Sequence, residues 1–94
     1  MRSFSENTQI TVEKNQVATD LGSEAAILNL TNGVYYGLDS VGARVWNLIR
    51  QPRTFGQLRD ILIEEYEVDA PRLESDLRSL LNQLADEQLV QISG

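Results

Sequence analysis

The chain lacks the residue types on which most acid–base, thiol and metal chemistry depends. Its 94 residues contain no histidine and no cysteine, which removes the usual general base near neutral pH, the thiolate nucleophile and the commonest metal ligands. Fourteen acidic residues remain, but no pair of them stands in a context typical of an acid–base dyad, and no calcium-loop pattern is present. We therefore expect no enzyme activity, no metal site and no cofactor.

Composition narrows the classes of partner further. Hydrophobic residues make up 41% and charged residues 23% of the chain, which is typical of an ordinary globular domain. The formal charge of −6 disfavours a nucleic-acid partner, because phosphate binding needs a basic face. No apolar run approaches the ~20 residues of a membrane span, and the first residues lack a signal-peptide pattern. We expect a cytoplasmic protein without a membrane partner, whose acidic surface serves solubility or steers a basic partner.

The residues that could bind another chain belong to a predicted hairpin. Two β-favouring runs, Ala26–Leu30 and Val34–Leu38, flank an Asn32-Gly33 pair, which is the strongest short-range signal for a type I′ turn. This turn would pair Leu30 with Tyr35, Asn29 with Tyr36 and Leu28 with Gly37. Alternation then places two sets on opposite faces: Ile27, Asn29, Val34, Tyr36 and Leu38 on one, and Leu28, Leu30 and Tyr35 on the other.

The second run should be an edge strand. An edge strand carries unpaired N–H and C=O groups, so an extended peptide could join the sheet there while pockets for its side chains supply specificity. Tyr36 and Leu38 are more typical of core positions than of direct partner contacts. Tyr35, on the opposite face, either packs under the N-terminal segment or faces the partner.

Three helices follow the hairpin. Asp39-Ser40 can cap the first, in which Val41, Val45, Leu48 and Ile49 recur at helical spacing. Thr54 and Gln57 fit a capping box that starts a second helix ending near Tyr66. Asp69 caps a third helix with Pro71 in its first turn and one apolar stripe made of Leu73, Leu77, Leu80, Leu81 and Leu84. On a helical wheel Leu80 lies at one margin of that stripe beside Asp76.

The order of elements predicts the fold class. Residues 9–12 and 16–19 alternate as weak strands, at least one of which should pair with the hairpin, and residues 89–92 form a terminal extended segment. We expect an α+β domain of the winged helix-turn-helix class, with a small three-stranded antiparallel sheet packed on three helices. Residues 1–8 should be a flexible N-terminus and residues 9–94 a single domain.

The chain resembles the PqqD-like domains, also called RiPP recognition elements, over roughly residues 16–92. The resemblance rests on Leu28-x-Leu30, Gly33-Val34-Tyr35-Tyr36-x-Leu38, Gly42-Ala43-x-x-Trp46-x-x-Ile49, and the late Asp76-Leu77…Leu81…Leu84…Leu89-Val90. Within the family, the Tyr-Tyr strand before Gly-Ala-x-x-Trp is most similar to the standalone proteins of split lasso-peptide systems.

The resemblance implies a non-catalytic module that holds the leader of a ribosomally made precursor peptide. In the lasso branch it implies delivery of the leader to a partner protease, followed by a cyclase. The leader would lie as an added strand against Val34–Leu38, with the third helix as the other wall. The expected peptide-binding residues are Val34, Tyr35, Tyr36, Gly37, Leu38, Leu73, Asp76, Leu77 and Leu80, with Leu77 and Leu80 as an apolar floor and Asp76 on the rim.

Other functions remain open from the sequence. A winged-helix DNA-binding regulator would share the element order, but its reading helix would offer only Arg72 and Arg78 against several acids. A dimerising domain could pair the free edge strand with its own copy. Within the family, a PqqD-type peptide chaperone for a radical SAM or other peptide-modifying enzyme is the alternative to the lasso branch.

Overall fold

The computed structural model describes residues 2–94, and it confirms the predicted α+β class with three helices. Among these residues no helix is long and apolar enough to cross a membrane. In chain order the elements are β1 (Gln9–Val12), β2 (Gln16–Asp20), β3 (Ala25–Asn29), β4 (Tyr35–Leu38), α1 (Ser40–Ile49), β5 (Arg53–Thr54), α2 (Phe55–Tyr66), α3 (Ala70–Asp86) and β6 (Val90–Ser93).

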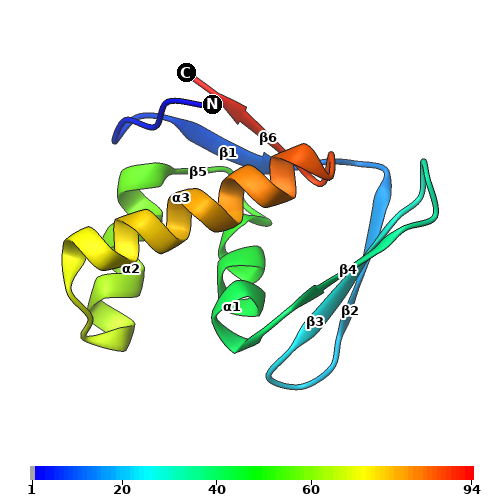
Figure 1. The fold of residues 1–94 in the computed structure, drawn as a ribbon, viewed down its shortest axis with the longest axis horizontal. Coiled ribbons are helices and arrows are strands. Elements are labelled where there is room, and N and C mark those ends of the chain that lie inside the picture. Colours follow the sequence, from blue (N-terminus) through cyan, green and yellow to red (C-terminus); the bar gives the residue numbers. More distant parts are fainter. Residues whose placement is uncertain (1) are drawn as a thin grey trace.

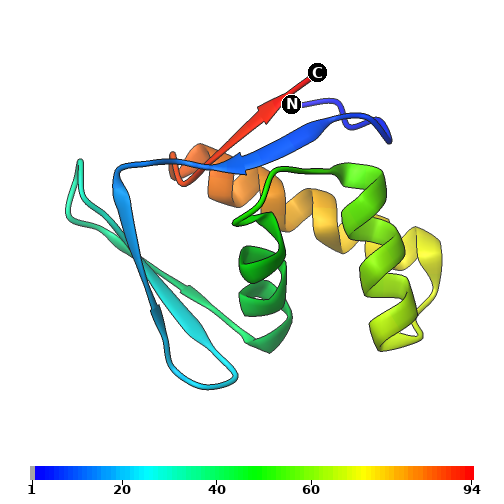
Figure 2. The same cartoon turned by 180° about the vertical axis from the view of Figure 1, so that it is seen from behind.

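The strands form two antiparallel sheets of three strands each, where the sequence predicted one. One sheet has the order β2-β3-β4 and the other β5-β1-β6. Figures 1 and 2 show the chain leaving β1 and bending sharply into β2, so that the sheets lie at different ends of the helical layer. The second sheet joins Val12 to Val90 and Ile10 to Ile92, pairs whose separation in sequence hides them from local patterns.

The hairpin register differs from the prediction by two residues. Ile27 pairs with Tyr36 and Leu28 with Tyr35, and the connecting loop is longer than a two-residue turn. Gly33 has a positive φ of 72°, but Asn32 does not, so the turn cannot be type I′. A shift of two residues keeps every side chain on the same face of the sheet, so the predicted faces of the strand residues are unchanged. Ile27, Asn29 and Leu38 are buried, as expected for the inner face, and Tyr35 is exposed on the outer face.

The side chain of Asn29 accounts for the longer loop. This residue is 3% exposed, and its amide nitrogen donates to the backbone carbonyl of Glu87 at the end of α3. Its side-chain oxygen accepts from the N–H of Thr31, while its backbone N–H donates to the carbonyl of Val34. Asn29 is therefore a tertiary anchor rather than a surface position of the hairpin, and the chain turns only after it.

All three predicted helix starts are confirmed. Asp39 accepts from the N–H of Gly42, and Asp69 accepts from the N–H of Arg72. The capping box of α2 is complete, since Thr54 and Gln57 each bond to the other's backbone. The helices enclose one core with the inner faces of both sheets, and its fully buried centre includes Trp46, Ile27, Ile10, Leu58, Leu81 and Leu84.

The segment before β1, where we expected a flexible N-terminus over residues 1–8, contacts α2 and the core. Thr8 is 2% exposed, and its carbonyl accepts from the N–H of Phe55 at the start of α2. Phe4 packs on the core, with its ring centroid 5.3 Å from that of Phe55. Met1 lies outside the described residues. Local sequence patterns could not indicate these contacts, because the contacting residues lie about fifty positions apart in the chain.

Candidate functional site

The free edge of β4 presents two residues with unused backbone groups. Because Asn29 bonds to Val34, and bonded pairs alternate along an antiparallel ladder, the next bonded pairs toward the strand end are Ile27 with Tyr36 and Ala25 with Leu38. The N–H and C=O groups of Tyr35 and Gly37 therefore point away from β3. No other strand of the described chain covers this edge, since β4 is terminal in its sheet.

A hollow, which we call the edge hollow, lies where β4 faces α3. Tyr36, Gly37 and Leu38 line it on the strand side, Asp39 lines its end, and Leu80 and Gln83 line it on the helix side. Tyr36 and Leu38 turn their side chains to the inner face of the sheet, so the outward backbone of Gly37 is the polar group best placed for an extended ligand. A Cβ at Gly37 would meet nothing within 4 Å, so the chain's own packing leaves this position open.

A second hollow, which we call the apolar hollow, adjoins the first at Leu80. It lies between α1, α2 and α3 and is lined by Val41, Val45, Leu62, Leu73, Asp76, Leu77 and Leu80. Asp76 is its one charged lining residue and is exposed at its margin. Leu77 is 2% exposed, whereas Leu80 is half-buried and belongs to both hollows. We call these two adjoining hollows the groove. Its helix-side part is apolar with a carboxylate at the margin, which suits an apolar side chain next to a polar or cationic one.

Two hydrogen bonds attach the hairpin to the last turns of α3 and define one end of this groove. The Tyr36 hydroxyl donates to the side-chain oxygen of Gln83 at 2.6 Å, and the Asn29 amide donates to the Glu87 carbonyl at 2.9 Å. Partial burial, and then the charge of Glu87, raise the pKa of Tyr36 above its ordinary value. The hydroxyl therefore stays protonated at neutral pH and available to donate.

The structure brings most of the predicted site residues together and leaves two apart. The groove includes Tyr36, Gly37, Leu38, Leu73, Asp76, Leu77 and Leu80. Val34 lies before β4 and is 50% exposed, and Tyr35 is 68% exposed on the outer face, so only their backbones are near the edge. Tyr35 also does not pack under the N-terminal segment, which was one of its two predicted placements.

Five residues that line the groove were not among the predicted site residues: Asp39, Val41, Val45, Leu62 and Gln83. Gln83 carries no local signal, because an exposed polar residue on a helix is typical of a solvated face. Val41 was assigned to the core stripe of α1, although it is 38% exposed and lines the apolar hollow.

The comparisons with known proteins point to one family. The sequence profile described as "Coenzyme PQQ synthesis protein D (PqqD)" matches residues 24–90. No curated protein matches the chain. A solved structure titled "TbiB1 in Complex with the TbiA(beta) Leader Peptide" is 34% identical, with a TM-score of 0.82 over 86% of this chain and 94% of that one.

A second solved structure, titled "Lasso peptide synthetase B1 complexed with the leader peptide", has the same fold. It is 17% identical to this chain, with a TM-score of 0.77 over 87% of this chain and 96% of that one. At this identity the likeness concerns the fold alone. Both matches span nearly the whole of the solved chains, so the likeness extends over complete domains rather than a shared motif.

Proposed function

This chain belongs to the PqqD family, and from that premise we propose that it binds the leader segment of a ribosomally made precursor peptide of the lasso type without modifying it. The leader would add as a strand to the free edge of β4, in the groove between β4 and α3. The single observation that carries the proposal is this edge. Tyr35 and Gly37 present unused N–H and C=O groups, and the edge hollow beside them is lined on its other side by α3.

The nature of the ligand is supported by the 34% identical protein, whose structure contains a leader peptide. Absence of histidine and cysteine from the sequence supports a binding role rather than a catalytic one. Ordering an unstructured peptide on binding costs several kcal/mol. We expect backbone hydrogen bonds and an anchored side chain together to exceed this cost and to give a dissociation constant that is roughly micromolar or tighter.

We further propose that the bound leader is delivered to a leader-cleaving protease, and that a cyclase acts afterwards. This step is supported by the absence of a nucleophile–base pair in the chain itself, since leader removal then needs another protein. The alternative within the family is a peptide chaperone of the PqqD type for a radical SAM enzyme. This alternative is favoured by the match of residues 24–90 to the family of the coenzyme PQQ synthesis protein D. The genes next to this one distinguish the two, because a protease and a cyclase accompany the first and a radical SAM enzyme the second.

A direct test titrates a fluorescent leader peptide against the protein and follows polarisation. The probes are the TbiA(β) leader and the leader of any short precursor that sequencing finds beside this gene. Gly37→Pro removes one outward N–H but no bond to β3, so it should keep the fold and weaken binding at least tenfold. Tyr36→Pro is the contrasting variant, because it removes an inward bond and should disrupt the hairpin.

Circular dichroism is the folding control for both variants, and mass spectrometry of the precursor should show no change after incubation with the protein alone. Failure of the parent protein to bind either leader would contradict the proposed function. Equal binding by folded Gly37→Pro would reject strand addition at this edge.

A further inference from the structure

The segment Arg2–Thr8, which we call the strap, lies across the start of α2 and along one flank of α3. Its backbone supplies two acceptors to α2: the Thr8 carbonyl accepts from the N–H of Phe55, and the Glu6 carbonyl accepts from the N–H of Gly56. These are N–H groups of the first helical turn, which no carbonyl within the helix can satisfy. The strap therefore completes the N-terminus of α2 from outside.

The glycine at position 56 is explained by the strap. A Cβ at Gly56 would lie 3.1 Å from the Glu6 carbonyl oxygen and 3.3 Å from the Glu6 Cβ. Glycine inside a helix lowers stability by about 0.5–1 kcal/mol relative to alanine. Gly56 does not have a positive φ, so its backbone conformation does not require glycine. The close approach of the strap is the feature of the described chain that needs this residue, so the two segments are fitted to each other.

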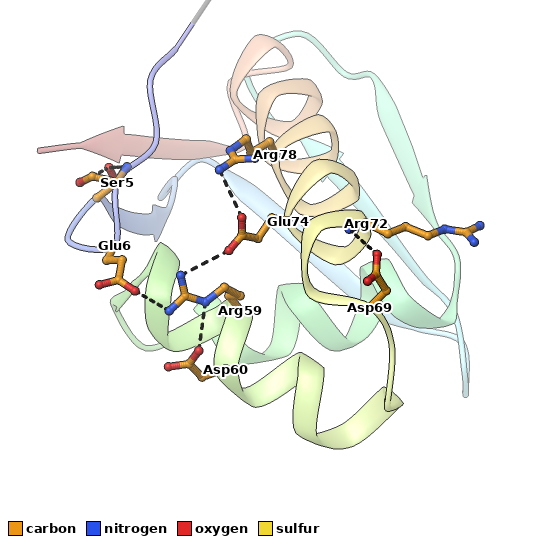
Figure 3. Close-up of polar contacts among 9 residues, drawn as sticks. Ser5, Glu6, Arg59, Asp60, Asp69, Arg72, Glu74 and Arg78 are labelled. Carbon is orange, nitrogen blue, oxygen red and sulfur yellow. Dashed lines mark hydrogen bonds and ion pairs between the residues drawn. The ribbon is translucent and has the colours of Figure 1, made fainter.

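Side chains extend the contact from α2 to α3. Phe4 packs on Phe55 at 5.3 Å between ring centroids, and the Arg78 guanidinium of α3 lies 5.3 Å from the centroid of the same ring. Arg59 of α2 pairs with Glu6 of the strap at 2.6 Å and with Glu74 of α3 at 3.4 Å. Figure 3 shows this ion-pair cluster between the strap, α2 and α3.

The strap and the groove occupy opposite flanks of α3. Strap-side contacts involve Glu74, Arg78, Asn82 and Asp86, which recur every four residues, and the last two accept from Arg2. Groove residues Asp76, Leu80 and Gln83 lie on the other side of the buried leucine stripe. Figure 3 shows Glu74 and Arg78 facing the cluster, while Arg72 projects from the other flank.

We infer that the strap is a positioning element for the leader groove, with Glu6 and Phe4 as its principal positioning residues. The inference rests on the proposed function and deepens it. On one flank α3 is held by ion pairs and by the contact of Arg78 with the Phe55 ring, so it presents its other flank at a set distance from β4. Strap docking and leader binding are thus coupled through the position of α3, and each strengthens the other.

The test compares the parent with the double variant Phe4→Ala/Glu6→Gln in the same leader titration. Its matched control is Leu21→Ala/Glu64→Gln, which removes one exposed apolar side chain and one exposed carboxylate away from both the strap and the groove. We expect the strap variant to bind leader about three- to tenfold more weakly, mainly through faster dissociation, and the control to match the parent. Glu6→Gln alone is the milder variant if the double variant fails to fold.

A second readout separates positioning from simple stability. The Phe55 and Gly56 amides bond to the strap, lie outside the groove, and report strap docking by hydrogen exchange. Leader binding should slow exchange at these two amides in the parent. A parent that binds no leader overturns both the proposed function and this inference. The strap inference alone is overturned if the parent binds leader, the folded strap variants bind it equally well, and amide exchange at Phe55 and Gly56 is unchanged by binding.

Discussion

The hydroxyl of Tyr36 on β4 donates a 2.6 Å hydrogen bond to the side chain of Gln83 on α3, and so connects the two walls of the candidate groove. Tyr36 stands between Tyr35 and Gly37, the two residues whose backbone groups face outward. The bond therefore holds the free edge of β4 at a defined distance from α3, which forms the opposite wall of the candidate groove.

Tyr36→Phe should widen the groove at this end and lower the free energy of unfolding by about 0.5–1.5 kcal/mol, the usual contribution of one hydrogen bond. Leader affinity should fall by a factor of a few. Tyr35→Phe is the matched control, because Tyr35 is 68% exposed and its hydroxyl has no bond among the described residues. Urea unfolding and leader titration measure the two effects. Identical behaviour of the two variants would show that the Tyr36–Gln83 bond does not hold the groove.

Leu80→Ala should weaken leader binding by about 1–3 kcal/mol, because Leu80 lines both hollows and would contact an apolar leader side chain. Its cost in stability should be smaller than that of Leu77→Ala, since Leu77 is 2% exposed and its loss leaves a cavity worth about 2–5 kcal/mol. Polarisation and urea denaturation of both variants separate binding from folding. Unchanged affinity for a folded Leu80→Ala variant would place the anchoring pocket elsewhere.

Asp76→Asn should keep the fold and weaken binding less than Leu80→Ala. Asp76 is exposed at the rim of the apolar hollow, so its attraction for a cationic leader group is screened by salt. The parent and the variant should therefore differ at low ionic strength and converge at about 1 M salt. A difference that persists at high salt would assign Asp76 a role other than charge attraction.

The Arg44–Glu65 pair, which joins α1 to α2, predicts a pH dependence of stability. Two hydrogen bonds of 2.9 and 2.6 Å from Arg44 lower the pKa of the Glu65 carboxyl. A depressed carboxyl pKa contributes stability above the unfolded-state value and loses it as pH falls through the folded-state value. Arg44→Gln should thus destabilise the protein by up to about 1 kcal/mol at pH 7, because the pair is partly exposed.

This difference should shrink at acid pH, below the ordinary glutamate range. Urea unfolding of the parent and Arg44→Gln at pH 7 and pH 3 measures it. A gap of the same size at both pH values would exclude the ion pair as its cause.

Local patterns predicted the helices and the hairpin faces because those features depend on neighbours in sequence. Asp39, Thr54 and Asp69 cap helices through bonds to residues three positions later. The loop register could not be predicted in the same way. It depends on Asn29 bonding to Glu87, 58 residues further along the chain. The second sheet was missed for a similar reason, since its edge strand β5 has only two residues and resembles a break.

The site was predictable where it coincides with the amphipathic pattern of α3. The margin of the leucine stripe located Leu80 and Asp76, which do line the groove. Gln83 and the strap contacts of Glu6 were not predictable, because single polar residues acquire such roles only through tertiary packing. The outward direction of the Tyr35 and Gly37 backbone was also hidden, since it requires the phase of the hydrogen-bond ladder.

The most direct test of strand addition is amide hydrogen exchange along β4 with and without a saturating amount of a leader peptide that the protein binds in the titration. The Tyr36 and Leu38 amides are already bonded to β3, whereas the Tyr35 and Gly37 amides face the free edge. We predict that leader binding slows exchange at Tyr35 and Gly37 far more than at Tyr36 and Leu38. Binding that leaves exchange at Tyr35 and Gly37 unchanged would contradict the proposal that the leader joins this sheet.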